Sequence, residues 1–493
     1  MKVLLVYPEF PDTFWSFKHA LKFIRKKSAY PALGLMTVGA MLPEEWAKRL
    51  VDLNATKLSE KDLAWADCVF ISAMAVQRES AHQTISRCKK RGLKVIAGGP
   101  LFTSEYEEFE DVDHFVLNEA ELSLPPFLAD LEKGCAKRVY ATSEFCDIRE
   151  TPAPMWELAD LKRYAAMSVQ FSRGCPFNCD FCNVTALLGH RPRIKTAEQV
   201  IAELDGLYKL GWRGQVFVVD DNFIGNKKYL KTQLLPKLIE WQKDKRGIPL
   251  NTEASINLAD DRMLMDMMVE AGFDTVFIGI ETPDEQGLTE CNKTQNKNRD
   301  LAENVRLIQK AGLQVQAGFI VGFDSDRPSI FQRQIDFIQK TGIVTAMVGL
   351  LQAPVGTRLY NRLKQEGRLA GKLSGDNVDG TTNIIPKMDQ NILFRGYRNM
   401  MRQIYSPKPY YQRIKTFLRT YRTPKFKTPL DFQRILALFR SSIRLGILGK
   451  ERIHYWKILS WTIFRRPELF PLVITFAIYG HHFRKIYKSL IRS

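Results

Sequence analysis

The feature that most constrains this chain is a run of three cysteines, Cys175, Cys179 and Cys182, with the spacing C-x3-C-x2-C. Zinc sites and fully ligated clusters usually take four protein ligands. Three thiolates at this spacing suit three irons of a 4Fe–4S cube. The fourth iron is then open to chelate a small molecule and deliver an electron to it. Phe181 adds an aromatic face beside the last cysteine. The alternative, three structural cysteines or a zinc knuckle, is disfavoured by the tight spacing.

The other cysteines and the start of the chain indicate a reducing, cytoplasmic location. Met1 and Lys2 run directly into Val3–Tyr7, a short apolar stretch typical of a buried strand and not of a signal peptide. The remaining cysteines are scattered, so they predict no disulfide framework: Cys68, Cys88, Cys135, Cys146 and Cys291. A length of 493 residues allows two or three domains.

Residues 1–145 alternate short apolar runs with helical patterns. The expected strands are Val3–Tyr7, Arg49–Leu53, Cys68–Ser72, Lys94–Ala97 and His114–Leu117. The expected helices are Leu33–Leu42, Asp62–Trp65, Ser80–Arg91 and Leu122–Lys133. Strands separated by helices predict an α/β domain with a doubly wound, Rossmann-like parallel sheet. Ligands of such sheets bind outside the carboxyl ends of the strands. The loops expected at that rim are Pro8–Trp15, Ala73–Glu79, Gly98–Thr103 and Asn118–Glu121.

Residues 146–370 continue the alternation beyond a linker with Pro152 and Pro154. The expected strands are Met167–Phe171, Gln215–Asp220, Leu250–Ala254, Thr275–Ile280, Gln314–Val321 and Ala346–Leu351. The expected helices are Thr196–Leu210, Leu230–Lys243, Asp260–Ala271, Arg299–Ala311 and Ser329–Thr341. About six β–α units predict a partial barrel whose chemistry lies at the carboxyl ends of its strands. The cysteine loop follows the first of these strands, as that chemistry requires.

Residues 371–493 are expected to form a basic helical extension. Residues 391–493 hold 22 Lys and Arg against 3 Asp and Glu, a charge of +19 against +18 for the whole chain. The apolar stretch Leu469–Tyr479 contains Pro471 and is too short to span a bilayer. Aromatic residues interleaved with cations favour an anionic membrane surface as partner. The alternatives are RNA and a helical cap whose outer face is only solvated. We expect four apolar residues to pack on the barrel: Phe432, Leu436, Phe439 and Leu445.

Behind the cysteine run, several strand ends resemble the radical S-adenosylmethionine (SAM) family, in which the open iron holds SAM. The matching segments are Phe277–Glu281, Thr252–Ser255, Gly318–Phe323, Leu350–Pro354 and Val218–Phe223. Cys175, Cys179 and Cys182 then hold the cluster. The resemblance implies SAM contacts at Phe181, Asp220, Glu253, Gly279, Glu281, Gly318 and Gly322. For Asp220, a helix N-cap and turn is an equally weighted alternative.

The N-terminal domain resembles the cobalamin-binding domain of cobalamin-dependent radical SAM enzymes, through Tyr30–Leu35, Gly98–Pro100 and Asn118–Glu121. The resemblance implies cobalamin contacts at Gly34, Ser72, Gln77, Gly98, Gly99 and Glu119. An Asp-x-His-x-x-Gly motif is missing from the sequence, so no lower-axial histidine is expected. The alternatives are a domain that keeps the fold without the cofactor, and a Glu119 that only caps a helix.

Over nearly its full length the chain resembles the cobalamin-binding radical SAM proteins with a C-terminal extension, the group of the hopanoid C-2 methylase. That resemblance implies a methyltransferase. A 5′-deoxyadenosyl radical takes hydrogen from an unactivated carbon, which then receives a methyl group from methylcobalamin. It implies a hydrophobic substrate such as a hopanoid or another membrane lipid. It also implies an electron donor such as flavodoxin or ferredoxin. The basic extension predicts a peripheral position at the inner membrane face.

Two other activities use the same cysteine run. A radical cyclase or C–C coupling enzyme would act on a lipid without adding a methyl group. An RNA-modifying radical SAM enzyme would use the basic extension on phosphates. Enzymes of that kind need a second cysteine triad in the N-terminal domain, and Cys68, Cys88 and Cys135 do not cluster. A nucleic-acid partner is therefore not expected.

Overall fold

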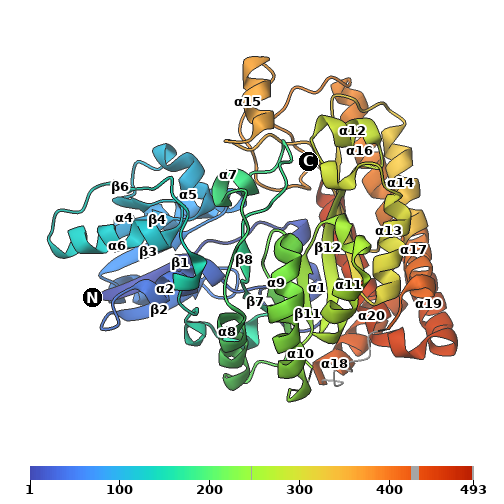
Figure 1. Cartoon of the computed structure of the whole chain (residues 1–493), viewed down its shortest axis with the longest axis horizontal. Helices are drawn as coiled ribbons and strands as arrows, with labels where there is room; N and C mark the ends of the chain where they lie inside the picture. Colours follow the sequence, from blue (N-terminus) through green and yellow to red (C-terminus); the bar gives the residue numbers. More distant parts are fainter. Residues whose placement is uncertain (246, 424–431, 491–493) are drawn as a thin grey trace.

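The computed structural model describes residues 1–245, 247–423 and 432–490. Two parallel sheets follow one another along the chain, and helices make up the C-terminal part (Figure 1). The N-terminal sheet lies at one side of the molecule, the second sheet in the middle, and the C-terminal helices at the opposite side. The predicted fold class is confirmed in all three parts.

The N-terminal sheet has six parallel strands in the order β2-β1-β3-β4-β5-β6. They are β1 (Lys2–Tyr7), β2 (Ala47–Asp52), β3 (Cys68–Ser72), β4 (Lys94–Gly98), β5 (His114–Val116) and β6 (Val139–Tyr140). All five predicted strands are present. The sixth, β6, is only two residues long, and no apolar run in the sequence marks it.

Helices cover both faces of this sheet because its strands are apolar on both sides. Val3 and Leu5 of β1 face α2 (Leu33–Met41) and α6 (Ala120–Glu132). Leu4 and Val6, which point the other way, face a second set of helices. This set comprises α3 (Glu60–Trp65), α4 (Arg78–Lys90) and α5 (Pro100–Glu105). A parallel sheet buried on both faces has continuous apolar strands, and the sequence shows such strands.

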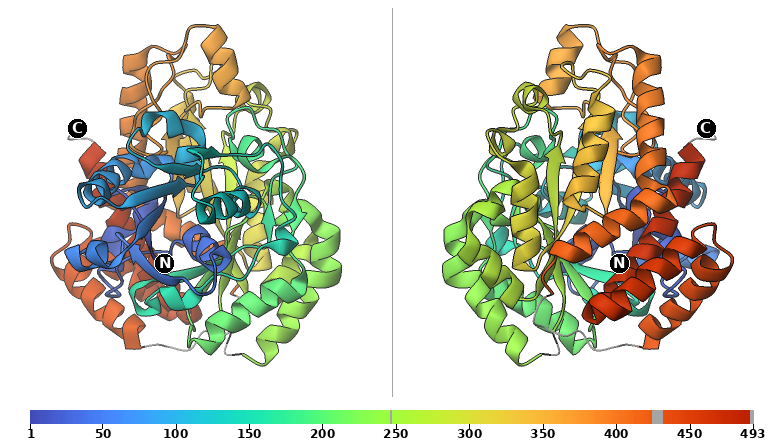
Figure 2. Two further views of the ribbon diagram at one scale, coloured as in Figure 1. Left: turned by 90° about the vertical axis from the view of Figure 1, so that its left-hand side faces the viewer. Right: turned by 90° about the vertical axis from the view of Figure 1, so that its right-hand side faces the viewer.

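The second sheet has six parallel strands in the order β14-β13-β12-β11-β10-β7, and it curves into a partial barrel (Figure 2). Its strands are β7 (Ala166–Val169), β10 (Gln215–Val218), β11 (Leu250–Glu253), β12 (Phe273–Glu281), β13 (Gln314–Val321) and β14 (Ala346–Leu350). Helices on its outer face include α8 (Ala197–Lys209), α10 (Leu235–Lys243), α11 (Arg262–Glu270), α13 (Leu301–Ala311) and α14 (Ile330–Thr341). The six strands and five helices predicted for this part of the chain are all found.

A short antiparallel pair that the sequence did not predict closes the cysteine loop. Strand β8 (Ser172–Arg173) precedes the cysteines and β9 (Arg193–Ile194) follows them, and the two pair with each other. Helix α7 (Val184–Leu188) lies between them. The loop therefore begins and ends at one place, beside the carboxyl end of β7.

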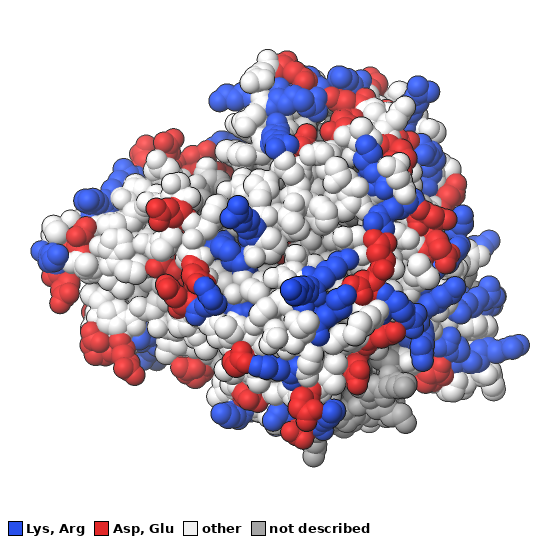
Figure 3. Space-filling model, viewed as in Figure 1, with Lys and Arg blue, Asp and Glu red and all other residues white. Residues whose placement is uncertain are grey.

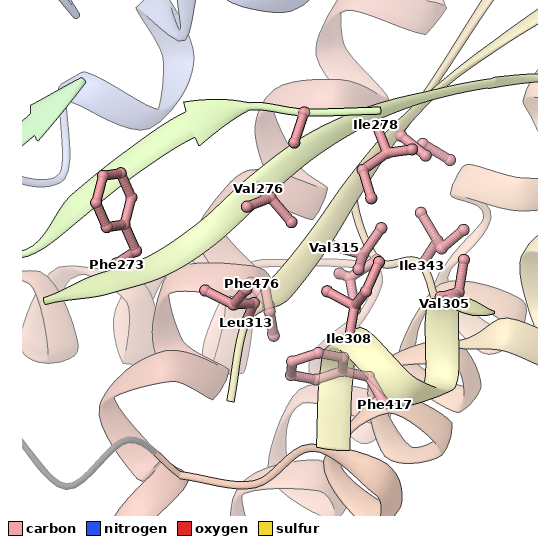
Figure 4. Packing of buried hydrophobic residues seen from close by; sticks show 14 of the residues in the cluster. Phe273, Val276, Ile278, Val305, Ile308, Leu313, Val315, Ile343, Phe417 and Phe476 are labelled. Atoms are coloured by element: carbon pink, nitrogen blue, oxygen red, sulfur yellow. The ribbon is translucent and has the colours of Figure 1, made fainter. Parts of the chain in front are cut away.

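The C-terminal extension is built into the barrel. Helices α16 (Gln390–Tyr405) and α17 (Pro407–Thr420) lie against α14. Phe417 of α17 and Phe476 of α20 (Phe470–Leu490) meet edge to face at 5.4 Å. Both belong to the same core as Ile308 of α13 and Val276 of β12 (Figure 4). The alternative of a helical cap thus describes α16, α17 and α20.

Two further helices, α18 (Phe432–Ser441) and α19 (Arg452–Arg465), lie outside this cap. The prediction that Phe439 packs on the barrel is wrong, because its side chain is 69% exposed. Leu445 is fully buried and Leu436 is half-buried, whereas the side chain of Phe432 lies outside the described part of the chain. Among the described helices, none has the length and apolar character needed to cross a bilayer.

The N-terminal segment packs against the last helix, so the two ends of the chain are in contact. Phe14, in the 3-10 helix η1 (Phe14–Ser16), stacks on Phe483 of α20 at 4.2 Å, and its carbonyl is 2.9 Å from His482 Nε2. The neighbouring Trp15 meets Phe277 of β12 at 5.4 Å. Residues 13–16 therefore lie between the barrel and α20. The predicted rim loop Pro8–Trp15 is therefore wrong for residues 13–15, whereas the Pro8 carbonyl accepts from Asn54 and Gln77 beside the N-terminal sheet.

Candidate functional site

The entry to the cysteine loop is fixed by Asp220, which follows β10. Its carboxylate accepts hydrogen bonds from the Phe171 backbone N–H at 2.9 Å and from Ser172 Oγ at 2.6 Å. Burial raises the pKa of Asp220 to about 7. Since both carboxylate oxygens are engaged, Asp220 anchors the end of the first barrel strand. The geometry favours this anchoring role over the predicted contact with SAM.

Two side-chain amides approach the cysteine sulfurs. Asn222 Nδ2 lies 3.9 Å from Cys175 Sγ, and Gln295 Nε2 lies 3.6 Å from Cys179 Sγ. Amide donors of this kind suit cluster-bound thiolates, whose reduction potential depends on hydrogen bonds to sulfur. Burial raises the pKa of the Cys182 thiol to about 12, so a bound cation is needed to make it a thiolate near neutral pH.

The three thiols suit a cluster better than a single ion. Within the described residues no three His, Cys, Asp or Glu side chains are placed to share one metal ion. The thiols of a three-cysteine cluster loop each bind a different iron and do not converge on one point. Phe181 lies beside them in an apolar group with Cys291, Phe323 and Leu359. The donor set therefore fits a 4Fe–4S cluster.

A buried ion pair stands next to the cysteines. Lys293 Nζ is 2.7 Å from Glu281 Oε1 and 5.8 Å from the centre of the Phe181 ring. The thiols and Glu281 raise the pKa of Lys293 above its usual range in spite of burial. Gly279 makes room for this pair, because a Cβ there would lie 2.2 Å from Glu281 Oε1. Lys293 was not predicted, since it follows a short helix and no strand.

Three predicted SAM residues lie on the carboxyl half of the barrel. Gly318 of β13 pairs in register with Gly279 of β12, and a Cβ on it would stand 3.1 Å from the Phe277 ring. Gly322 has a φ of +104°, which glycine adopts without strain. Glu253 ends β11, and burial together with the carboxylates of Asp221 and Asp220 raises its pKa to about 8. A neutral Glu253 can donate a hydrogen bond at pH 7.

A cavity of about 440 Å³ lies at the carboxyl ends of the N-terminal strands and reaches the barrel mouth at Gln170 and Val219. It is lined by five of the six residues predicted to contact cobalamin: Gly34, Ser72, Gly98, Gly99 and Glu119. The sixth, Gln77, lies outside it, because its amide binds the Pro8 carbonyl and the Met74 N–H.

The floor of this cavity depends on two glycines. A Cβ on Gly98 would lie 2.5 Å from the Val116 carbonyl oxygen, and one on Gly99 would lie 2.4 Å from Ser72 Oγ. Gly99 also has a φ of +88°. Bare backbone at this edge allows a flat, mostly apolar ligand to approach closely. The lining therefore fits a corrin ring.

Glu119 and Glu121 bridge the two domains. Arg173 of β8 donates to Glu121 at 2.7 Å and to Glu119 at 3.2 Å, and Arg193 of β9 donates to Glu119 at 2.7 and 2.8 Å. Arg173 is the main cause that lowers the pKa of Glu121 to about 2 against the opposing effect of burial. The Glu119 side chain caps no helix, so the capping alternative is wrong, and its contact with cobalamin stays a prediction.

A further buried ion pair lies in the cavity wall and was not predicted from the sequence. Lys195 binds Glu203 of α8, and both side chains are almost fully buried. The second oxygen of Glu203, Oε2, has no hydrogen-bond partner among the described residues. A hydrogen-bond donor on a bound ligand can pair with this oxygen. The only sequence signal was a charged residue on the apolar face of a predicted helix.

The comparisons with known proteins agree with this geometry. A model of the radical SAM superfamily matches residues 169–338, and a domain of unknown function (DUF4070) matches residues 357–493. An uncharacterized methyltransferase of Synechocystis sp. is 41% identical over 501 residues, covering 100% of this chain and 93% of that protein. The hopanoid C-2 methylase of Rhodopseudomonas palustris is 34% identical over 496 residues, covering 98% and 92%.

The chain belongs to the radical SAM methyltransferases. Radical SAM enzymes use a 4Fe–4S cluster and SAM, and the Cys175–Cys182 loop is where this methyltransferase carries the matching thiols. Its fold resembles that of the cobalamin-dependent radical SAM enzyme OxsB, solved with aqua-cobalamin. The TM-score is 0.62 at 15% identity, covering 100% of this chain and 80% of that chain. The family and the fold class predicted from the sequence are confirmed.

Proposed function

We propose that this radical SAM methyltransferase is cobalamin-dependent and methylates an unactivated carbon of a hydrophobic, lipid-like substrate, a hopanoid or another membrane lipid. The observation that carries the proposal is the cavity at the edge of the N-terminal sheet. It opens toward the barrel mouth, and its floor is the Gly98–Gly99 backbone. The substrate class is supported by the 34% identity to the hopanoid C-2 methylase.

When bound, the cluster and SAM supply a 5′-deoxyadenosyl radical and cobalamin supplies the methyl group. Cys175, Cys179 and Cys182 hold the cluster, and Asn222 and Gln295 orient the sulfurs. The residues that border SAM in this proposal are Phe181, Glu253, Gly279, Glu281, Gly318 and Gly322. Asp220 positions the cysteine loop, because its carboxylate binds the Phe171 N–H at the end of the strand that leads into the loop.

On the cobalamin side, Gly34, Ser72, Gly98 and Gly99 lie against the corrin in this proposal. Glu119 acts as a positioning residue, because its carboxylate holds Arg173 and Arg193 at the two ends of the cysteine loop. The mostly apolar lining around these residues would limit the access of water to a bound cobalamin.

The proposed partners are a lipid-like substrate, an electron donor such as flavodoxin or ferredoxin, and an anionic membrane surface. The excess of cations after residue 390 supports peripheral attachment at the inner membrane face. A nucleic-acid partner is not proposed.

The test uses anaerobically reconstituted enzyme with SAM, cobalamin, reduced flavodoxin and a bacterial lipid extract. We expect 5′-deoxyadenosine and a lipid heavier by one methyl group, together with corrin absorption bands in the purified protein. A lipid product without added mass would favour the cyclase or C–C coupling alternative. Formation of neither 5′-deoxyadenosine nor a methylated lipid would refute the proposal.

A further inference from the structure

Exposed apolar side chains are concentrated in one segment of the chain. Nine of the seventeen large apolar side chains that are exposed in the described part of the chain lie between residues 435 and 464. We call these nine the apolar ridge: Ile435, Phe439, Ile443, Ile447, Leu448, Ile453, Trp456, Ile463 and Phe464. Contiguous exposed apolar surface is uncommon on soluble monomers and marks interaction sites.

The apolar ridge belongs to a helical hairpin. Its first arm is α18 continued by the π-helix η11 (Ser442–Ile447), and its second arm is α19, which packs against η11. Ile447 and Leu448 lie at the tip, where Leu448 is 76% exposed. Phe464, at the far end of α19, is 84% exposed.

Helix α19 is apolar on two sides, and only one of them is covered. Tyr455, Ile458 and Leu459 are buried toward the rest of the protein. Ile453, Trp456 and Ile463 recur at helical spacing on the exposed side. A helix that is apolar all round is normally buried all round. The second side of α19 is therefore an apolar surface that the described part of the chain leaves uncovered.

On the first arm, one stripe repeats every four residues. Ile435, Phe439, Ile443 and Ile447 are all exposed. Ala437, Ser441 and Leu445, which alternate with them, are buried. The stripe faces away from α20, against which α18 packs. Both arms of the hairpin thus present apolar side chains outward.

The charges around the apolar ridge are mostly positive, which favours an anionic partner. Between residues 435 and 465 there are six Lys and Arg and a single acidic residue, Glu451. Glu451 is buried and bound to Arg484 at 2.6 Å, so it does not neutralise the surface. Arg444, Lys450 and Lys457 are exposed. Figure 3 shows Lys and Arg side chains along the edge where α17 and α19 lie in Figure 1.

We propose that the hairpin of α18 and α19 inserts its apolar ridge into the interfacial region of an anionic lipid bilayer. Interfacial helices combine apolar and aromatic side chains on one face with Lys and Arg beside them. Each cation adds affinity for anionic headgroups. A second copy of this chain is a poorer partner, because a two-fold interface would bring like charges together. The inference deepens the proposed function by naming the surface through which a membrane substrate is reached.

The base of the hairpin is tied to the rest of the enzyme. Arg440 Nη1 donates to the Phe23 carbonyl at 2.6 Å, and the Arg444 guanidinium lies 5.8 Å from the centre of the Phe23 ring. Phe23 precedes Leu33 and Gly34 in the chain, and these two residues line the cavity. A hairpin seated in a bilayer therefore holds the cavity at a defined position relative to the lipid.

The test is a flotation assay of the full-length reconstituted holoenzyme with two kinds of vesicle, phosphatidylcholine alone and an equal mixture with phosphatidylglycerol. The ridge variant is Phe439→Ser/Leu448→Ser/Phe464→Ser. The matched control is Leu210→Ser/Met263→Ser/Ile385→Ser, which removes three exposed apolar side chains elsewhere. We expect binding to the mixed vesicles, and at least about a tenfold lower partition coefficient for the ridge variant only.

Several results would overturn the inference. One is equal vesicle binding by the ridge variant and the wild type. Another is a wild-type dimer that binds no vesicles and becomes a monomer in the ridge variant, since the ridge would then be an interface between copies. Circular dichroism melting verifies that all variants fold. SAM cleavage and corrin absorption are measured in solution on the same samples, so a failure of the proposed function is seen separately from a failure of vesicle binding.

Discussion

Glu119 holds Arg193 by two parallel hydrogen bonds, from Nη1 to Oε2 at 2.7 Å and from Nη2 to Oε1 at 2.8 Å. The two residues belong to different domains. Glu119 follows β5 of the N-terminal sheet, whereas Arg193 lies in β9 at the exit of the cysteine loop. Bidentate pairs of this kind fix orientation as well as distance. The carboxylate therefore sets the angle between the proposed cobalamin cavity and the cluster loop.

Replacing Glu119 by Ala leaves Arg193 without a buried carboxylate, whereas Arg173 keeps Glu121. We expect the free energy of unfolding to fall by about 3 kcal/mol, since removal of one partner from a buried ion pair is costly. Titration with guanidinium chloride measures this change in the free energy of unfolding. Glu240→Ala, which breaks an exposed pair with Lys243, is the control and should have no measurable effect. Equal effects of the two changes would contradict the role assigned to Glu119.

The three loop cysteines are expected to hold all the iron. Cys175→Ala, Cys179→Ala or Cys182→Ala should remove the cluster and abolish SAM cleavage, because three thiolates are the minimum for this cluster. The corrin bands should remain, since none of the three cysteines lines the cavity. Iron analysis and electron paramagnetic resonance give the readout. The same change at any other cysteine should leave the iron content unaltered, and iron loss there would overturn the ligand assignment.

Gly99 is expected to be essential for cobalamin retention. In Gly99→Ala the new Cβ would meet Ser72 Oγ at 2.4 Å, and the residue would keep a φ of +88°. Gly92→Ala is the matched control, because Gly92 has a φ of +71° with nothing within 4 Å of the Cβ. Gly92→Ala should lose about 1 kcal/mol of stability through backbone strain. Gly99→Ala should lose more, because a φ of +88° with a ψ of 179° is essentially restricted to glycine. Only Gly99→Ala should lose the corrin absorption, and its retention would count against the cavity.

Lys293 should raise the reduction potential of the cluster. Its ammonium lies among the cysteine thiols and Glu281, so it stabilises the more negative, reduced form. Lys293→Met is therefore expected to shift the potential to more negative values. Lys293→Arg keeps the charge and should shift it less. A redox titration followed by electron paramagnetic resonance measures both, and an unchanged potential in Lys293→Met would refute this role.

The Glu121–Arg173 pair predicts a dependence of stability on pH. The pKa of Glu121 is lowered to about 2 in the folded protein from a usual value of 4.5. Its contribution is therefore complete above about pH 5 and is lost as the pH falls from 4.5 toward 2. The wild type should exceed Glu121→Gln by on the order of 3 kcal/mol above pH 5. The difference should shrink below pH 4.5, and a constant difference down to pH 2 would contradict the shift.

The strands were predictable from the sequence because buried parallel strands are continuous apolar runs. Strands β6, β8 and β9 have only two residues each, too few for any periodicity. The contacts of Glu119 were not predictable, since Arg173 and Arg193 lie 54 and 74 residues away along the chain. Spacing identified the cysteines because all three lie in one loop.

The helical extension was predictable from its amphipathic pattern, but the direction of its apolar side chains was not. A helix such as α19, with apolar residues on two sides, does not reveal which side packs inward. Phe439 shows the consequence, because it was expected inside and is exposed. Only the packing of α18 and α19 on α20 distinguishes the two sides.

The stacking of Phe14 on Phe483 affects how the chain is made. During translation, Phe14 leaves the ribosome long before its stacking partner Phe483, in the last helix, has been synthesised. Phe14 and Phe17 therefore lack their partners in α20 during almost the whole of translation. The barrel can complete its core only when Phe476 and Phe483 arrive. We therefore expect the nascent chain to depend on chaperones until its synthesis is complete.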